Sequence, residues 1–100
     1  MEAKLINRGT EGELLLIGRL DTNSANEMAK IFEMMAQRFD AVILNLSQMD
    51  YTASSGLRLI LNLQKAMDRK GGDLKVRGAR PTVMEVFEMT GFASFLTFIT

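Results

Sequence analysis

The chain has 100 residues, with 12 basic and 12 acidic side chains and no net charge, and it contains no histidine, cysteine or tryptophan. A Ser-His-Asp triad, a cysteine nucleophile, a disulfide framework and a Cys/His zinc site are excluded, because each needs residue types that are missing. The length predicts one small domain, residues 1–100, and a hydrophobic content of 47% is typical of a globular protein.

No apolar run approaches the roughly 20 residues that a membrane-spanning helix needs, so no membrane insertion is expected. The first residues are polar and acidic, unlike a secretory leader, so no signal peptide is expected, and the lack of cysteines is compatible with the cytosol. The sequence has neither a G-x-x-x-x-G-K-[ST] nor a G-x-G-x-x-G motif, and its carboxylates are spread along the chain. An enzyme or nucleotide-binding protein is therefore the weakest interpretation, and no catalytic residue, cofactor or metal ligand is expected.

The two halves of the chain differ in charge. Residues 1–50 carry 5 basic and 8 acidic side chains, a net charge of −3, whereas residues 51–100 carry 7 and 4, a net charge of +3. Residues 58–80 alone hold 7 basic and 2 acidic side chains. A nucleic-acid surface is one interpretation of this segment. An isoelectric point near 6.2 and the lack of interleaved aromatic residues favour solvated helix and strand faces, so no direct nucleic-acid contact is expected.

The first part of the chain predicts a β-hairpin followed by a helix. Strands are expected at residues 5–8 and 13–19, around a turn at residues 9–12 whose glycines can supply a positive φ. Cap-forming residues follow at 21–24, and Ser24 and Glu27 have the spacing of a capping box. The helix that begins there has an apolar stripe at steps of three and four, made of Ala25, Met28, Ala29, Phe32, Met35, Ala36 and Phe39. Its methionines are interpreted as core residues rather than ligand contacts.

The second part alternates strands with helices. Residues 41–46 form an apolar run without alternation, typical of a strand covered on both faces, so helices are expected on two sides of the sheet. A loop at 47–53 leads into a helix at 54–69, which two glycines at 71 and 72 end. A strand at 74–77, a helix opened by Pro81 and ending at residues 90–91, and a last strand at 95–99 complete the chain.

The order ββαβαβαβ predicts an α/β fold: a mixed, mainly parallel sheet of about five strands, with one antiparallel edge and helices packed against it. In such sheets, ligands and partners bind at the carboxyl ends of the strands. Residues 21–26, 49–56 and 78–81 are therefore the predicted functional rim.

The most informative rim segment is Asp50-Tyr51-Thr52-Ala53-Ser54-Ser55-Gly56-Leu57, where a buried strand passes into a helix. One interpretation is a plain serine N-cap, which stabilises a helix by about 1 kcal/mol. The glycine in the first turn costs up to about 1 kcal/mol relative to alanine, which indicates a close approach by another backbone or a partner. A phosphate on Ser54 would also be tolerated at a helix N-terminus, where its roughly −1.5 to −2 charges would act on a partner.

Residues 42–46 followed by 50–57 resemble the strand, loop and helix start of the STAS domain, in the anti-sigma factor antagonist branch. Gly18-Arg19-Leu20-Asp21 is similar to that family's turn into its first helix. Gly71 and Gly72 with residues 74–76 are similar to its helix-to-strand passage, and residues 81–91 to its third helix and exit. The resemblance covers nearly the whole chain.

This resemblance implies a small cytoplasmic protein that binds an anti-sigma factor, usually a serine-protein kinase of the histidine-kinase-like ATPase type, and so frees the sigma factor. Phosphorylation by that kinase switches the protein off, the phosphoacceptor position falls on Ser54, and a PP2C-type phosphatase restores activity. No catalysis by the protein itself is expected. The expected partner-binding residues are Asp21, Thr22, Asn23, Thr52, Ser55 and Arg58. For Asp21 a helix cap is an equal interpretation, and Arg58 is also explained as an ordinary exposed residue.

Two departures from the family are visible. Ala53 stands where many antagonists have Asp or Ser. The family often continues into a fourth helix after the last strand, whereas this sequence stops at Thr100, so that helix is either absent or lies outside the given sequence. Apolar surface left exposed by a missing helix could pair with another chain, so a monomer or weak dimer is expected. An alternative function is a STAS-like accessory subunit that docks on the ATPase of a lipid-trafficking ABC transporter without phosphorylation.

Overall fold

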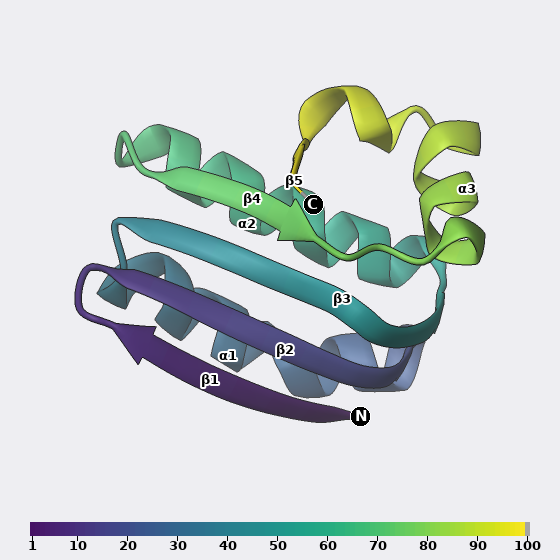
Figure 1. The fold of residues 1–100 in the computed structure, drawn as a ribbon, viewed down its shortest axis with the longest axis horizontal. Coiled ribbons are helices and arrows are strands. Elements are labelled where there is room, and N and C mark those ends of the chain that lie inside the picture. The colour runs from purple at the N-terminus through teal and green to yellow at the C-terminus, as the bar shows by residue number, and fades with distance from the viewer. Residues whose placement is uncertain (100) are drawn as a thin grey trace.

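The computed structural model describes residues 1–99. Its strands are β1 (Glu2–Arg8), β2 (Glu11–Leu20), β3 (Ala41–Thr52), β4 (Asp73–Arg77) and β5 (Thr97–Ile99). Its helices are α1 (Thr22–Arg38), α2 (Ser54–Arg69), α3 (Pro81–Met89) and the 3₁₀ helix η1 (Phe92–Phe95) (Figure 1). The last strand is shorter than predicted, because η1 occupies the residues before it.

The strands form one sheet in the order β1-β2-β3-β4-β5, in which β1 is antiparallel to β2 and all other neighbours are parallel. The predicted mainly parallel sheet with one antiparallel edge is confirmed. The hairpin turn is shorter than the predicted four residues, because Arg8 already pairs with Glu11. Gly9 supplies the positive φ, at 80°, and Gly12 belongs to β2.

Both long helices lie on one face of the sheet (Figure 1), which corrects the expectation of helices on two sides. The strand order advances in one direction from β2 to β4, so right-handed crossovers place α1 and α2 on the same side. Helix α3 packs against β3 and η1, at the end of the sheet where the parallel strands finish. Among residues 1–99 no helix covers the opposite face, which is called the open face below.

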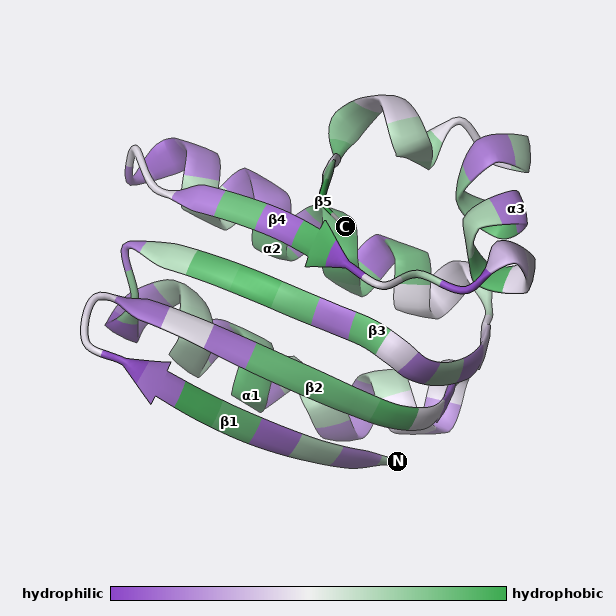
Figure 2. Cartoon of the chain, viewed as in Figure 1, coloured by the Kyte–Doolittle hydropathy of each residue, from purple (hydrophilic) through white to green (hydrophobic). Residues whose placement is uncertain are grey.

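The core fills the space between the sheet and the two long helices. The middle of β2 and the first half of β3 are hydrophobic (Figure 2). The predicted stripe of α1 faces them, with Met28, Phe32, Met35 and Phe39 all at most 5% exposed. The methionines of this stripe are core residues, as predicted. Within the described part of the chain, no helix combines the length and the hydropathy needed to cross a membrane.

A buried acid lies on the open face. Glu13 of β2 is 2% exposed. Its carboxylate accepts hydrogen bonds from Arg8 Nη1 at 2.7 Å, Asn45 Nδ2 at 2.9 Å and Arg77 Nη1 at 3.0 Å. These donors belong to β1, β3 and β4. One carboxylate therefore connects four adjacent strands.

β3 runs to Thr52, whereas the sequence predicted a strand ending at residue 46 and a loop over 47–53. Its first part pairs with both neighbours, up to the pairing of Asn45 with Arg77. The remainder continues beside β2 alone, to the pairing of Thr52 with Leu20. Two register shifts occur along this stretch, at which β3 gains residues relative to β2. The long strand carries the chain directly to the start of α2.

Candidate functional site

The candidate site lies where β2 and β3 end and α1 and α2 begin. The two strand ends are joined by a hydrogen bond from the Ala53 N–H to the Leu20 carbonyl at 2.9 Å. The third predicted rim segment, residues 78–81, contacts β3 on the side away from β2. There Arg80 donates from Nε to the Ser47 carbonyl at 2.9 Å and pairs through Nη1 with Asp50 at 2.7 Å. The three predicted rim segments therefore meet at one end of the sheet.

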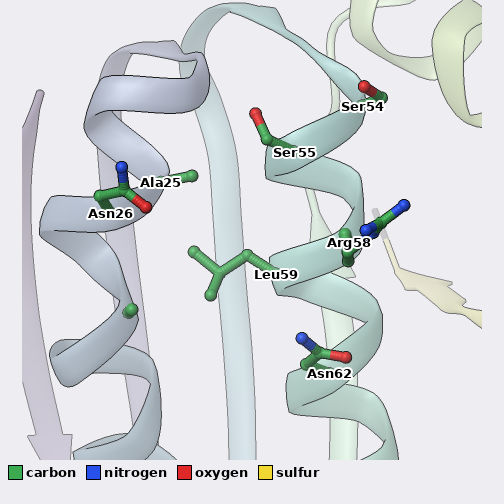
Figure 3. A pocket seen from close by; sticks show the side chains of 8 residues that line it. Ala25, Asn26, Ser54, Ser55, Arg58, Leu59 and Asn62 are labelled. Carbon is green, nitrogen blue, oxygen red and sulfur yellow. The ribbon is translucent and has the colours of Figure 1, made fainter.

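Ser54 is the first residue of α2 and is exposed. The N-cap position belongs to Ala53, which has extended backbone angles and makes no side-chain cap hydrogen bond. A plain serine cap, one of the two interpretations of this segment, is therefore not what the structure contains. The Ser54 hydroxyl is left at the surface of the first turn (Figure 3).

Ser55 occupies a different environment from its neighbour. It is half-buried, and its Oγ lies 3.2 Å from the Thr22 Oγ1 of α1, so the two hydroxyls share a hydrogen bond. In Figure 3, Ser55 points toward α1, whereas Ser54 lies on a different side of α2. The bridge connects the first turns of the two long helices.

A shallow cavity of about 360 Å³ opens between these first turns. Both serines line it, together with Ala25 and Asn26 of α1 and Arg58 of α2. Arg58 is exposed one turn beyond Ser54 (Figure 3), and within residues 1–99 its guanidinium makes no ion pair. The structure therefore brings together Ser54, Ser55, Thr22 and Arg58, all of which the sequence had nominated.

Asp21 is the N-cap of α1, three residues earlier than the predicted capping box of Ser24 and Glu27. Its Oδ1 accepts a hydrogen bond from the Ser24 N–H at 3.1 Å, and the Ser24 Oγ accepts one from the Asp21 N–H at 2.9 Å. The backbone and hydroxyl hydrogen bonds from Ser24, helped by the charge of Arg19, hold the pKa of Asp21 below its ordinary value. Asp21 thus fixes the start of α1, while Thr22 and Asn23 beside it are exposed.

Thr52 differs from the other predicted contact residues, because it is only 2% exposed. It supports the site from beneath. A Cβ atom at Gly56 would lie 2.6 Å from the Thr52 Oγ1 and 2.7 Å from the Leu20 Cγ. The glycine in the first turn of α2 is therefore explained by close packing on the ends of β2 and β3.

Replacing Gly56 with alanine is expected to lower the free energy of unfolding by about 1 to 2 kcal/mol. Overpacking of a core costs roughly 1 to 3 kcal/mol, and the better helix propensity of alanine returns up to about 1 kcal/mol. Urea unfolding followed by circular dichroism measures the change. Asn62→Ala, at an exposed position of the same helix, is the control and should stay within about 0.5 kcal/mol. A Gly56→Ala protein as stable as this control would contradict the packing argument.

Four side chains that flank the rim were not nominated individually: Arg19, which precedes the predicted segments, and Asp50, Tyr51 and Arg80, which lie inside them. The guanidinium of Arg19 lies 4.2 Å from the ring centroid of Tyr51, and Arg80 pairs with Asp50. Tyr51 is 41% exposed, which is high for a large apolar side chain. The sequence could have indicated Arg19 and Tyr51 by their positions, because both come near the carboxyl ends of adjacent parallel strands.

The sequence of this chain matches the family model of the STAS domain over residues 6–100. The chain belongs to the STAS domain family. Its relatives include BtrV of Bordetella bronchiseptica, provisionally named an anti-sigma factor antagonist, at 35% identity over 91% of this chain and 81% of BtrV. An anti-sigma F factor antagonist of Paenibacillus polymyxa is 30% identical over 76% of this chain and 67% of that protein.

Solved structures show the same fold. The anti-sigma factor antagonist SpoIIAA in its unphosphorylated form superimposes with a TM-score of 0.84 over 99% of this STAS domain and 89% of the SpoIIAA chain, at 20% sequence identity. A STAS domain protein of Planctomyces limnophilus gives a TM-score of 0.86 over 98% of this chain and 88% of its own, at 15% identity. At these identities the likeness concerns the fold alone.

Proposed function

We propose that this STAS domain is an anti-sigma factor antagonist, which binds an anti-sigma factor of the serine-protein kinase type and so releases the sigma factor. The names of the two curated relatives support this assignment over the accessory subunit of an ABC transporter. The proposed contact surface consists of the exposed and half-buried rim residues Asp21, Thr22, Asn23, Ser55 and Arg58, with Thr52 holding the rim from below. The proposed role is binding in the cytoplasm, without catalysis by this chain.

Ser54 is the proposed phosphorylation switch, and the main support for this choice is that its side chain is exposed. A kinase must reach the acceptor hydroxyl, and Ser54 is exposed at the first turn of α2. Ser55 is half-buried and shares its hydroxyl with Thr22 at 3.2 Å. Phosphorylation of Ser55 would break that bridge between α1 and α2, whereas phosphorylation of Ser54 breaks no hydrogen bond of its side chain within residues 1–99.

The switch would act through charge. The kinase transfers the γ-phosphoryl group of its bound ATP to the Ser54 Oγ, with ADP leaving, and a PP2C-type phosphatase hydrolyses the ester to inorganic phosphate. The added charge of roughly −1.5 to −2 lies at a helix N-terminus, which tolerates an anion. The fold therefore stays intact. The contact surface becomes costly to desolvate, and the partner dissociates.

Phosphate mapping tests the choice of serine. The protein is incubated with ATP and the serine-kinase-type anti-sigma factors encoded in the same genome, and the product is analysed by peptide mass spectrometry. We expect one phosphate, on Ser54, which Ser54→Ala abolishes and Ser55→Ala leaves in place. Phosphate on Ser55, or on neither serine with a kinase that binds this protein, would overturn the proposed switch.

A further inference from the structure

β1 is an edge strand that leaves one side of the sheet open to pairing. Among residues 1–99 it is bonded only to β2, and six of its seven residues are exposed. Leu5 and Ile6 are 38% and 43% exposed. Figure 1 shows β1 along a free margin of the sheet, and Figure 2 shows a hydrophobic stretch in its middle. Such an edge is a template for another strand.

The pairing with β2 determines which backbone groups of β1 are free. In an antiparallel ladder, residues that direct their N–H and C=O toward one neighbour alternate with residues that direct them away. The pair of Arg8 and Glu11 closes the two-residue hairpin turn, so the even-numbered residues of β1 face β2. Ala3, Leu5 and Asn7 therefore present their backbone groups at the free edge.

We infer that two copies of this chain pair through β1, antiparallel and about a two-fold axis at Leu5. In this register Leu5 lies opposite Leu5 of the second copy, and Ala3 lies opposite Asn7, so the free backbone groups meet. Glu2 of each copy lies opposite Arg8 of the other, which gives two cross-strand pairs of opposite charge. The two ends of the strand Glu-Ala-Lys-Leu-Ile-Asn-Arg are thus complementary in charge, and Arg8 also pairs with Glu13 of its own chain at 2.7 Å.

Neighbouring registers with the same backbone pairing are disfavoured by charge. Centring the axis on Lys4 places the two Lys4 side chains opposite each other. Centring it on Ile6 places Lys4 opposite Arg8. In the register centred on Leu5, Lys4 lies opposite Ile6, and its aliphatic stem can cover that side chain while the ammonium group stays in water. Like charges directly opposite each other are destabilising, and of these three registers only the one centred on Leu5 avoids them.

The same register extends the hydrophobic core. Leu5 pairs with Leu14, a core residue that is 1% exposed, so Leu5 lies on the helix-covered side of the sheet. Contact between the two Leu5 side chains would remove exposed apolar surface on that side. The charged pairs of Glu2 and Arg8 would lie on the open face. A ten-stranded sheet results, with Ser54 of each copy free, since α2 follows β3, two strands away from the edge.

A single introduced cysteine tests the register, because the chain has none of its own. In Leu5→Cys the two sulfurs meet across the axis, so mild oxidation should yield a disulfide-linked dimer. In the matched control Asn7→Cys, the two Cα atoms are offset by about 14 Å along the strands, beyond the roughly 7 Å that a disulfide spans. We expect Leu5→Cys to cross-link at least about tenfold faster. Equal rates would overturn the inference.

Sedimentation of the cysteine-free protein gives an independent reading. The interface is small, so the mass should rise from 11.2 kDa toward twice that value as the protein concentration increases. Leu5→Lys places two ammonium groups on the axis and should remain a monomer at every concentration. Met89→Lys, at a residue 79% exposed on α3, should associate like the parent protein. A parent mass that never rises, or one that rises equally in Leu5→Lys, would refute pairing through β1. These outcomes do not depend on the proposed phosphorylation.

Discussion

Ser54→Asp is expected to weaken binding to the cognate anti-sigma factor by at least about 100-fold, which corresponds to about 2.7 kcal/mol. The hydroxyl that it replaces is exposed on the rim. A charge buried at an interface without a partner costs about 2 to 5 kcal/mol, so even the single charge of aspartate should be enough. Phosphoserine carries more charge and should weaken binding further. Isothermal titration calorimetry measures the affinities.

Two controls separate the site from the charge. Ser94→Asp adds the same charge at an exposed position of η1, and it should bind like the parent protein. Ser54→Ala removes the hydroxyl without adding charge, and it should also bind. The circular dichroism spectrum of Ser54→Asp should be unchanged, because an acidic residue in the first turn of a helix is favourable. If Ser54→Asp binds the anti-sigma factor as tightly as the parent protein does, the proposed switch is wrong.

The start of α2 was predictable because several local signals agree there. An apolar strand, two serines and a glycine mark the passage from strand to helix, and the helix begins at Ser54 as expected. The capping box of α1 was misplaced because two pairs have the required spacing. Asp21 and Ser24 form the box instead of Ser24 and Glu27. The Ser24 hydroxyl also donates to the Arg19 carbonyl at 2.6 Å, which fixes it inside the first turn.

The second half of β3 was missed because its burial does not alternate. Leu46, Met49 and Thr52 are buried, whereas the residues between them are exposed. That spacing of three arises from the two register shifts, at which β3 gains residues relative to β2. The period of two that identifies a strand is therefore absent from the sequence. The two register shifts also turn the Thr52 side chain toward the core. Thr52, which the sequence predicted as a partner contact, is therefore buried beneath the rim.

The hydrogen bonds of Glu13 could not be predicted from the sequence, because the donors are 5, 32 and 64 residues away from it. Only the pairing of four strands brings Arg8, Asn45 and Arg77 to one carboxylate. Desolvation of that carboxyl raises its pKa. The hydrogen bonds from Arg8 and Asn45 and the charges of Arg77 and Arg8 outweigh this effect and hold the pKa below the ordinary value of 4.5. The ionised form is therefore the one that stabilises the folded state.

Glu13→Gln should lower the free energy of unfolding by about 2 kcal/mol at pH 7, because the amide has no negative charge to pair with Arg8 and Arg77 and offers one acceptor oxygen where the carboxylate has two. Since the pKa of Glu13 is lower in the folded chain, its contribution is complete above the unfolded value of 4.5 and disappears as the pH falls through the folded value below it. The difference from the parent protein should therefore vanish in acid. Glu11→Gln is the matched control, because Glu11 lies 3.9 Å from the same Arg8 with a side chain 40% exposed.

Urea unfolding of the three proteins between pH 7 and pH 3 distinguishes a buried ionic cluster from surface charge. The Glu11→Gln protein should stay within about 0.5 kcal/mol of the parent throughout, as expected of an exposed pair. A Glu13→Gln deficit that persists unchanged in acid would assign the loss to packing rather than to ionisation.

The two-fold pairing of β1 adds a further expectation, because Arg8 belongs to the cluster and also faces Glu2 of the second copy. Glu13→Gln removes the negative charge that Arg8 pairs with inside its own chain, and dimerisation should survive that change.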